Sequence, residues 1–289
     1  MLELAAASPD ETLHVVDLPD RLCSWALDDP SNVAVWADTR GRLAAWAVLQ
    51  APFWTIDVAI RPEAEDDLFP RVLDWIDARA RSAKGTPHER PSWYFDVFAD
   101  QAGRLRCLEA AGYACQADVG EDSWSRVLLR REGPAPSLPR LSAEFAVRPL
   151  AGRIELEKYV ELHRATFESK NMTVDWRART LTAPHYLSDS DLVAVAPDGR
   201  LAGFCIGWLL PQPDPVGQIE PLGIGREFRE HGLGAALLAE CVRRLAARGA
   251  RTVLVETDTY RTPALGLYEG AGFAPIRDVL VYRKDAPSL

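Results

Sequence analysis

Two side chains and one glycine-containing turn in the second half of the chain could transfer protons and bind an anion, which is chemistry that acyl transfer uses. Glu220 lies on an apolar stretch, the run Arg229-Glu230-His231-Gly232-Leu233-Gly234 follows it, and Tyr268 lies further along. An Arg-x-x-Gly-x-Gly turn that opens a helix gathers backbone N–H groups around one point, where they and the helix dipole favour an anion such as a pyrophosphate. Glycine suits this turn because a Cβ would hold the ligand away from the backbone.

Acyl transfer from a thioester to an amine needs a base, an acid and a polarised carbonyl. An alkylammonium has a pKa near ~10.4 and cannot attack until it loses a proton. The carboxylate of Glu220 could accept a proton, directly or through a water, and the hydroxyl of Tyr268 could donate one. The alternatives are a solvated carboxylate at a strand edge for Glu220 and a packed ring on a short helix for Tyr268.

The order of these motifs resembles the acetyl-CoA site of the GCN5-related N-acetyltransferases, the GNAT superfamily. Ala264, Leu267, Tyr268 and Gly272-Phe273 match the family pattern Asn-x-x-Ala-x-x-Leu-Tyr-x-x-x-Gly-Phe, with Arg261 in place of the usual asparagine. The role of Arg261 is left open: it could reach a CoA phosphate or an anionic acceptor, or face water. The resemblance covers roughly residues 144–285.

The resemblance implies a binding site for acetyl-CoA as co-substrate. It also implies that Glu220 is the general base, directly or through a water, and that Tyr268 is the general acid that protonates the departing sulfur. It implies that the backbone of Leu222, Gly223 and Ile224 contacts the pantetheine arm where the strand splays from its neighbour. It also implies that the diphosphate binds the turn formed by Arg229, Glu230, His231, Gly232, Leu233 and Gly234.

Pro221 gives a prediction about the strand that carries Glu220. Proline cannot donate to a sheet ladder, so it predicts an edge or a bulge. Because side chains alternate along a strand, we expect residues 218, 220, 222 and 224 to share one face. Gln218 is then a neighbouring candidate for substrate contact.

The hydrophobic periodicity predicts alternating helices and strands in both halves, hence an α/β (α+β) protein. The resemblance implies that these elements form two tandem GNAT-like domains, each a mixed, mostly antiparallel central sheet flanked by helices. In the first half we expect strands at 32–36, 43–49, 54–60 and 93–98, with helices at 68–83 and 103–111. In the second half we expect helices at 154–168, 233–248 and 263–271, with strands at 192–195, 201–210, 219–224, 252–256 and 279–283.

A Pro-rich stretch and an internal similarity define the predicted domains. The stretch Arg131 to Arg140 has three prolines and no periodicity, so we place domains at 1–132 and 144–289 with a linker at 133–143. Leu-Glu-Ala-Ala-Gly-Tyr at 108–113 matches Tyr-Glu-Gly-Ala-Gly-Phe at 268–273, which indicates a duplication. An unrelated α/β domain is the alternative for the first half.

The first half lacks the groups that would bind a pyrophosphate. Aligning Ile60 with Ile224 places Glu65, Asp66 and Asp67 opposite Arg229, Glu230 and His231, and it places Leu68 and Pro70 opposite the two glycines. Like charges, bulk and a missing N–H oppose a pyrophosphate there. Aligning the two closing motifs puts Leu108 opposite Tyr268. We therefore expect no acetyl-CoA site in the first half.

Composition narrows the remaining function classes. The net charge of −9 argues against sequence-independent nucleic-acid binding, which needs a basic surface. The five cysteines are scattered without CxxC spacing, and the start lacks a secretory signal, so we expect a cytoplasmic protein. The five histidines show no paired spacing, so we expect no metal site; His163 is expected to be solvated or capping. The apolar tract at 43–60 is too interrupted for a membrane span.

We therefore expect an acetyl-CoA-dependent N-acyltransferase that acetylates a primary amine of a small-molecule acceptor by direct attack. The tandem layout is also similar to that of the mycothiol synthases, which acetylate a cysteinyl amine on a sugar-linked thiol. The strand with Glu220 and Pro221 differs from theirs, so this acceptor is kept as an alternative. A further alternative is a binding protein that senses acyl-CoA without turnover.

Overall fold

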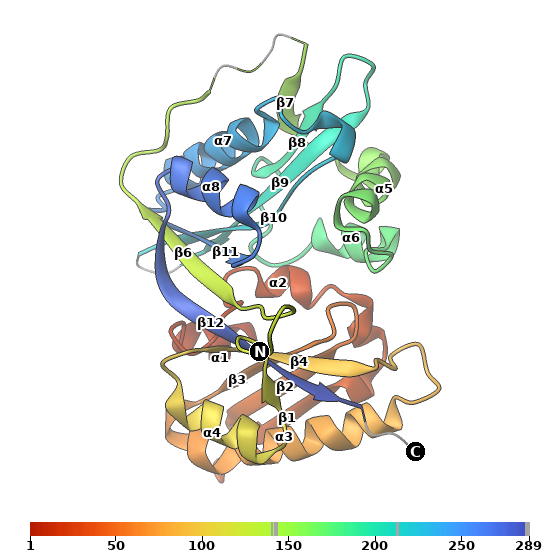
Figure 1. Ribbon diagram of the computed structural model, residues 1–289, viewed down its shortest axis with the longest axis vertical. Coiled ribbons are helices and arrows are strands. Elements are labelled where there is room, and N and C mark those ends of the chain that lie inside the picture. The colour runs from red at the N-terminus through yellow and green to blue at the C-terminus, as the bar shows by residue number, and fades with distance from the viewer. Residues whose placement is uncertain (140, 142–143, 212–213, 287–289) are drawn as a thin grey trace. The chain divides into compact units, whose positions relative to one another are not determined.

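The computed structural model describes residues 1–139, 141, 144–211 and 214–286 (Figure 1). The chain forms two compact units. Unit 1 comprises Met1–Val127, Asp258–Tyr260 and the residues from Arg277 onward; unit 2 comprises Leu128–Thr257 and Arg261–Ile276. The contiguous domains 1–132 and 144–289 remain a prediction, and positions 140, 142 and 143 of the predicted linker lie outside the described residues.

Unit 1 is a sheet with the order β1-β2-β3-β4-β12 and short β5 beside β12. The β1–β2, β2–β3 and β4–β12 pairs are antiparallel, whereas β3 and β4 are parallel. Its strands and α-helices are α1 (Leu2–Ala7), α2 (Leu18–Arg21), β1 (Val33–Ala37), β2 (Leu43–Gln50), β3 (Thr55–Ile60), α3 (Glu65–Ser82), β4 (Ser92–Phe98), α4 (Ala102–Ala110) and β5 (Ala114–Cys115).

The core of unit 1 lies between its sheet and α3. The buried stripe of α3 recurs at helical spacing, at Leu68, Val72, Leu73 and Ile76, and it packs in one cluster with side chains of β2, β3 and β4. The cluster also includes Tyr282, which β12 supplies from the end of the chain. Unit 1 therefore needs a strand from the C-terminus to complete its sheet.

Unit 2 has the strand order β6-β11-β10-β9-β8-β7. The β7–β8, β8–β9 and β9–β10 pairs are antiparallel, and β10 and β11 are parallel. Its strands and α-helices are β6 (Arg126–Glu132, entering from unit 1), β7 (Ala146–Pro149), α5 (Leu156–Phe167), α6 (Val174–Thr180), β8 (Asp191–Val195), β9 (Leu201–Leu210), β10 (Val216–Ile224), α7 (Leu233–Ala247), β11 (Thr252–Asp258), α8 (Thr262–Gly270) and β12 (Ala274–Asp285, leaving for unit 1).

Glycines let the helices of unit 2 approach both faces of its sheet (Figure 1). A Cβ built on Gly207 of β9 would lie 2.6 Å from Cys241 Sγ of α7. On the opposite face, a Cβ on Gly223 of β10 would lie 2.9 Å from a methyl carbon of Thr166 on α5. The sheet is thus enclosed between α7 and α5, with fully buried Phe204 and Leu237 on its two sides.

The predicted fold class is confirmed: each unit is a mixed, mostly antiparallel sheet flanked by helices. The predicted strands and helices all occur, with ends shifted by a few residues, and Leu201–Leu210 has the predicted bounds. Sequence reasoning missed α1, α2, α6, β5, β6 and β7. Among the described residues, none of the helices has both the length and the hydrophobicity that a membrane crossing demands.

The contact between β9 and α7 gives a stability prediction. Gly207→Ala should destabilise the protein by about 1–3 kcal/mol, because a methyl group must displace the buried Cys241 side chain. Gly103→Ala is the matched control, since a Cβ on this helical glycine meets nothing within 4 Å. Thermal unfolding should show a lower Tm for the first variant and an unchanged or slightly raised Tm for the second. Equal effects would contradict close packing at Gly207.

Candidate active site

The pairing of strand β10 with β11 ends at Gln218, two residues before Glu220. The parallel ladder between the two strands covers Val216 to Gln218, opposite Thr252 to Leu254. On its other side β10 continues to pair with β9 as far as Ile224. Among the described residues of β10, those from Glu220 onward therefore have β9 as a neighbour on one side and a gap, without a ladder partner, on the other side.

The predicted irregularity at Pro221 is a β-bulge. Ile219 pairs with Gly207 and Leu222 pairs with Cys205, so Glu220 and Pro221 together lie opposite Ile206. Two residues opposite one is the signature of a bulge, and it accommodates a proline that has no N–H to donate. The prediction from Pro221 is confirmed.

The bulge overturns the prediction that residues 218, 220, 222 and 224 share one face. A Cβ on Gly217 would meet Leu245 of α7, whereas a Cβ on Gly223 would meet Thr166 of α5. Both positions are odd-numbered, so an uninterrupted strand would place them on the same face. The extra residue reverses the alternation, and Gln218 consequently lies on the opposite face from Leu222 and Ile224.

Glu220 and Tyr268 come from different elements and act on one another electrostatically. Tyr268 lies on α8 and is 6% exposed, and its ring packs edge-on against Phe273 at 5.9 Å between centroids. Burial and then the negative charge of Glu220 raise the pKa of Tyr268 above its ordinary value, while Arg261 acts in the opposite direction. The hydroxyl therefore stays protonated at neutral pH, as a proton donor must.

The turn after β10 presents a series of amides without backbone acceptors. Glu230 and Gly232 both have a left-handed backbone, with φ of 67° and 73°, and His231 lies between them. Helix α7 begins at Leu233 without a side-chain cap, and its first backbone bond from this region is Ala236 N–H to Gly232 O. Within the described residues, the N–H groups of 229–235 therefore have no backbone acceptor. Free N–H groups at a helix start are a type of arrangement that can bind an anion.

Glycine suits positions 232 and 234 of the turn for different reasons. A Cβ on Gly232 would meet nothing within 4 Å, so its left-handed φ and the open space above it make glycine suitable. A Cβ on Gly234 would lie 3.3 Å from Leu267 Cδ2, so this glycine allows α8 to approach the start of α7. The backbone of Leu222, Gly223 and Ile224 leads from the bulge into this turn.

The structure also shows where other residues that the sequence singled out are located. Arg261 is exposed at the start of α8, and His231 is exposed, with Nδ1 2.8 Å from Arg229 O. The expectation of a solvated or capping His163 is wrong, because its ring stacks on Phe204 at 5.5 Å and burial lowers its pKa to about 4.

In unit 1 the corresponding turn is replaced by helix. Both β3 and β10 end at the aligned isoleucines, Ile60 and Ile224, but α3 begins at Glu65, opposite Arg229. The residues aligned with the glycine turn therefore form the first turns of α3, where acids complement the helix dipole. Glu65 accepts two hydrogen bonds from Arg104 of α4, at 2.7 and 3.1 Å.

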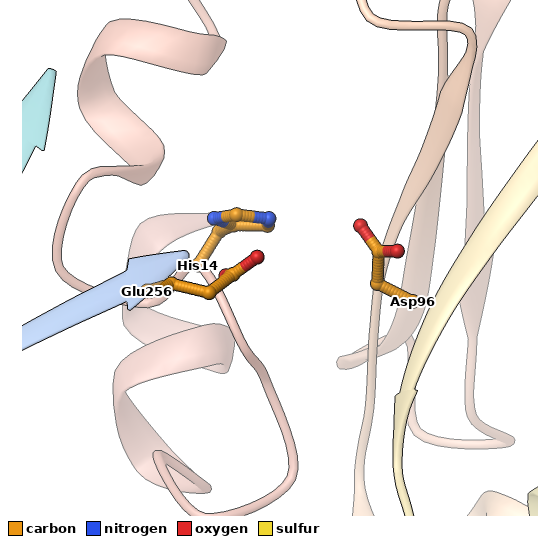
Figure 2. A group of neighbouring side chains, drawn as sticks. All are labelled: His14, Asp96 and Glu256. Atoms are coloured by element: carbon orange, nitrogen blue, oxygen red, sulfur yellow. The ribbon is translucent and has the colours of Figure 1, made fainter. Parts of the chain in front are cut away.

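Strands β3 and β4 of unit 1 also part, since their parallel ladder is the single pair Thr55 and Tyr94. The chain's own residues 11–18 occupy the region between them, where Arg104 Nη1 donates to Glu11 O at 3.0 Å. His14 of this segment faces Asp96 of β4 (Figure 2), with ring nitrogen and carboxylate oxygen within 4.8 Å. The remaining cavity is about 30 Å³, room for one or two waters.

Comparison with known proteins identifies the family. Residues 156–273 match the Acetyltransferase (GNAT) family. A mycothiol acetyltransferase of Kineococcus radiotolerans is 36% identical over 163 residues, 52% of this chain and 52% of that protein. One from Arthrobacter sp. (strain FB24) is 30% identical over 267 residues, 87% of this chain and 76% of that protein. The chain thus spans about half the length of the first relative and about three quarters of the second.

Solved structures share the fold at low identity. A GCN5-related N-acetyltransferase from Sphaerobacter thermophilus has a TM-score of 0.66 at 20% identity, covering 90% of this chain and 82% of that one. A tandem GNAT protein from the clavulanic acid biosynthesis pathway has a TM-score of 0.67 at 16% identity, covering 100% of this chain and 94% of that one. The tandem arrangement expected from the internal similarity is confirmed.

His163 gives a prediction for acid stability. A folded-state pKa of about 4 against an ordinary 6.5 means that the unfolded chain binds a proton first, so stability falls as the pH drops from about 6.5 toward 4. His163→Phe retains the stack on Phe204 and removes this titration. Between pH 7 and 5 the variant should lose about 1–2 kcal/mol less unfolding free energy than the wild type in urea titrations. Parallel pH profiles would refute a neutral buried imidazole.

Proposed function

Because this chain belongs to the GNAT family of acetyltransferases, we propose that unit 2 transfers an acetyl group from acetyl-CoA to the primary amine of a small-molecule acceptor. One observation carries the proposal. Beside the bulge at Glu220 and Pro221, β10 no longer pairs with β11, Tyr268 lies within electrostatic reach, and the strand leads on to a turn whose amides have no backbone acceptor in the described part of the chain.

In the proposed reaction the amine attacks the thioester carbonyl directly. Glu220 takes the amine proton, itself or through a water, so that the nitrogen lone pair is available. The C–N bond forms and the attacking nitrogen releases its remaining excess proton to water. The C–S bond breaks, the departing thiolate receives the hydroxyl proton of Tyr268, and water then reprotonates the tyrosine. The buried Tyr268 carries its hydroxyl proton before the reaction, which is the form that a donor needs.

The co-substrate is proposed to bind along the open edge of β10 and at the turn that follows. Backbone groups of Leu222, Gly223 and Ile224 would hold the pantetheine arm, since this edge lacks a ladder partner among the described residues. The diphosphate would bind the amides of Arg229, Glu230, His231, Gly232, Leu233 and Gly234, with the dipole of α7 adding to the attraction.

Unit 1 is proposed to bind no acetyl-CoA. Three acids and a regular helix stand where unit 2 has its amide turn, and these acids would repel a diphosphate. The gap between β3 and β4, which is the counterpart of the pantetheine gap, holds residues 11–18 and a cavity of about 30 Å³. We propose that unit 1 has a structural role and that the chain binds one acetyl-CoA.

For the acceptor, we propose to test first the cysteinyl amine of a sugar-linked thiol. Relatives named mycothiol acetyltransferase support this choice, including one of which this chain spans 76%. The strand with Glu220 and Pro221 is expected to differ from that of the mycothiol synthases. This difference affects the residue that would act as the base, and the attack of an amine on the thioester stays the same. Other small primary amines form the comparison panel.

Substitution of the base and acid tests the mechanism. Glu220→Gln and Tyr268→Phe should each lower kcat by roughly 10²-fold, because each removes one proton transfer. The measurement is release of free CoA thiol with the cysteinyl amine and the amine panel. Acetyl-CoA affinity should stay within a few-fold, which serves as the folding control. Binding of acetyl-CoA without thiol release for any amine would favour the acyl-CoA sensor.

Calorimetry tests the binding site with two matched glycines. Gly232 and Gly85 both have a left-handed φ, 73° and 74°, and open space around the position of a Cβ. Each valine variant therefore carries a similar backbone strain, but only Gly232→Val places a side chain over the amide turn. We expect one acetyl-CoA per chain, at least tenfold weaker binding by Gly232→Val and unchanged binding by Gly85→Val. Equal losses, or two sites per chain, would overturn the assignment.

A further inference from the structure

The bulge that carries Glu220 is held by an indole from the neighbouring strand. The β9 ladder passes from Ile219 to Leu222, so it skips Glu220 and Pro221. Trp208 of β9 donates its Nε1–H to the carbonyl oxygen of Glu220 at 2.8 Å. A bulged carbonyl and a buried indole N–H each need a partner, and this bond satisfies both.

Trp208 is itself fixed in place. Its side chain is fully buried, and its backbone pairs with Gln218, the last residue of β10 to pair with β11. The ring of Tyr186 packs edge-on against it at 6.2 Å between centroids, and the Tyr186 hydroxyl donates to Asp191 at 2.5 Å. Asp191 is fully buried and forms an ion pair with Arg177.

These contacts form a rigid support that ends at the backbone of Glu220. The buried ion pair of Arg177 and Asp191 holds Tyr186, Tyr186 packs on Trp208, and Trp208 bonds the bulge. An indole donor is stiff, because its N–H is fixed by ring packing rather than by rotation about a flexible chain. A small shift of the bulge would move the carboxylate relative to the reacting amine, and rates are sensitive to such shifts.

We propose that Trp208 is the positioning residue for Glu220: its indole N–H fixes the bulge so that the carboxylate of Glu220 reaches the amine of the acceptor. This inference rests on the proposed role of Glu220 as the general base. Trp208 does not touch the reacting atoms in this proposal, and it acts through the backbone of Glu220. It should therefore govern turnover rather than acetyl-CoA binding.

A double-mutant cycle with Glu220→Gln and Trp208→Phe tests the proposal. Phenylalanine keeps an aromatic ring against Tyr186 and removes the N–H donor. Alone, Trp208→Phe should lower kcat roughly tenfold to a hundredfold and leave the KM for acetyl-CoA within about twofold. In the Glu220→Gln background the same change should have almost no further effect, because the group that it positions is already absent.

Trp46→Phe is the matched control. Trp46 is also fully buried and donates Nε1–H to a backbone carbonyl, that of Met1 at 3.1 Å, but it belongs to unit 1. Its kcat should stay within about twofold of the wild type. If Trp208→Phe does not fold, benzothienylalanine at position 208 keeps the bicyclic shape and lacks the N–H, and the same loss of kcat is expected.

The outcomes separate this proposal from the proposed function. Two outcomes would overturn the positioning role and leave Glu220 as the base. In the first, Glu220→Gln loses activity while Trp208→Phe keeps its kcat. In the second, Trp208→Phe lowers kcat equally in the wild-type and Glu220→Gln backgrounds. A Glu220→Gln variant with wild-type kcat would overturn both. Loss confined to Trp208→Phe in the wild-type background supports both.

Discussion

The organisation of unit 2 depends on a change of hydrogen-bond partners in β10. Up to Gln218 this strand pairs on both sides, and beyond the bulge it pairs with β9 alone among the described residues. A sheet that stayed paired would leave no edge for a ligand, because its backbone groups would already be satisfied. The bulge also reverses the alternation of side chains, so Gly223 turns toward α5 while Ile224 lies near the start of α7.

The same parting of parallel strands occurs in both units, yet its surroundings differ. In unit 1 residues 11–18 fill the region beside β3 and β4, and Arg104 binds both Glu11 and Glu65 there. In unit 2 the strand ends in a turn with two left-handed residues and an uncapped helix. The two units thus share this strand geometry and differ in the charged residues and chain segments that surround it.

Much of the fold was predictable because its hydrophobic periods are strong. Helix α7 and strand β9 have long apolar patterns, and the turn at Gly232 is defined by residue type alone. The short elements β5 and α2 were missed because two to four residues carry no period. Strand β6 was missed because its buried residues Val127 to Leu129 form a short run flanked by arginines, without alternation.

Errors at the site arose where spacing in sequence does not give position in space. The face of Gln218 was wrong because a proline signals a bulge without telling how many residues it adds. His163 was expected in solvent because a single histidine on a helix does not reveal the aromatic rings that Tyr159, Phe167 and Phe204 place around it. Trp208 carried no recognisable signal, since its contact with Glu220 exists only through the pairing of β9 and β10.

The membership of β12 in unit 1 has a consequence for biosynthesis. Residues 277–285 pair with β4, and Tyr282 joins the core that the first half of the chain builds. During synthesis these residues emerge after the segments of unit 2, so the edge of β4 has no β12 partner until those segments have been made. Unit 1 cannot complete its sheet before that point, and an unpaired strand edge is open to wrong pairing in the meantime.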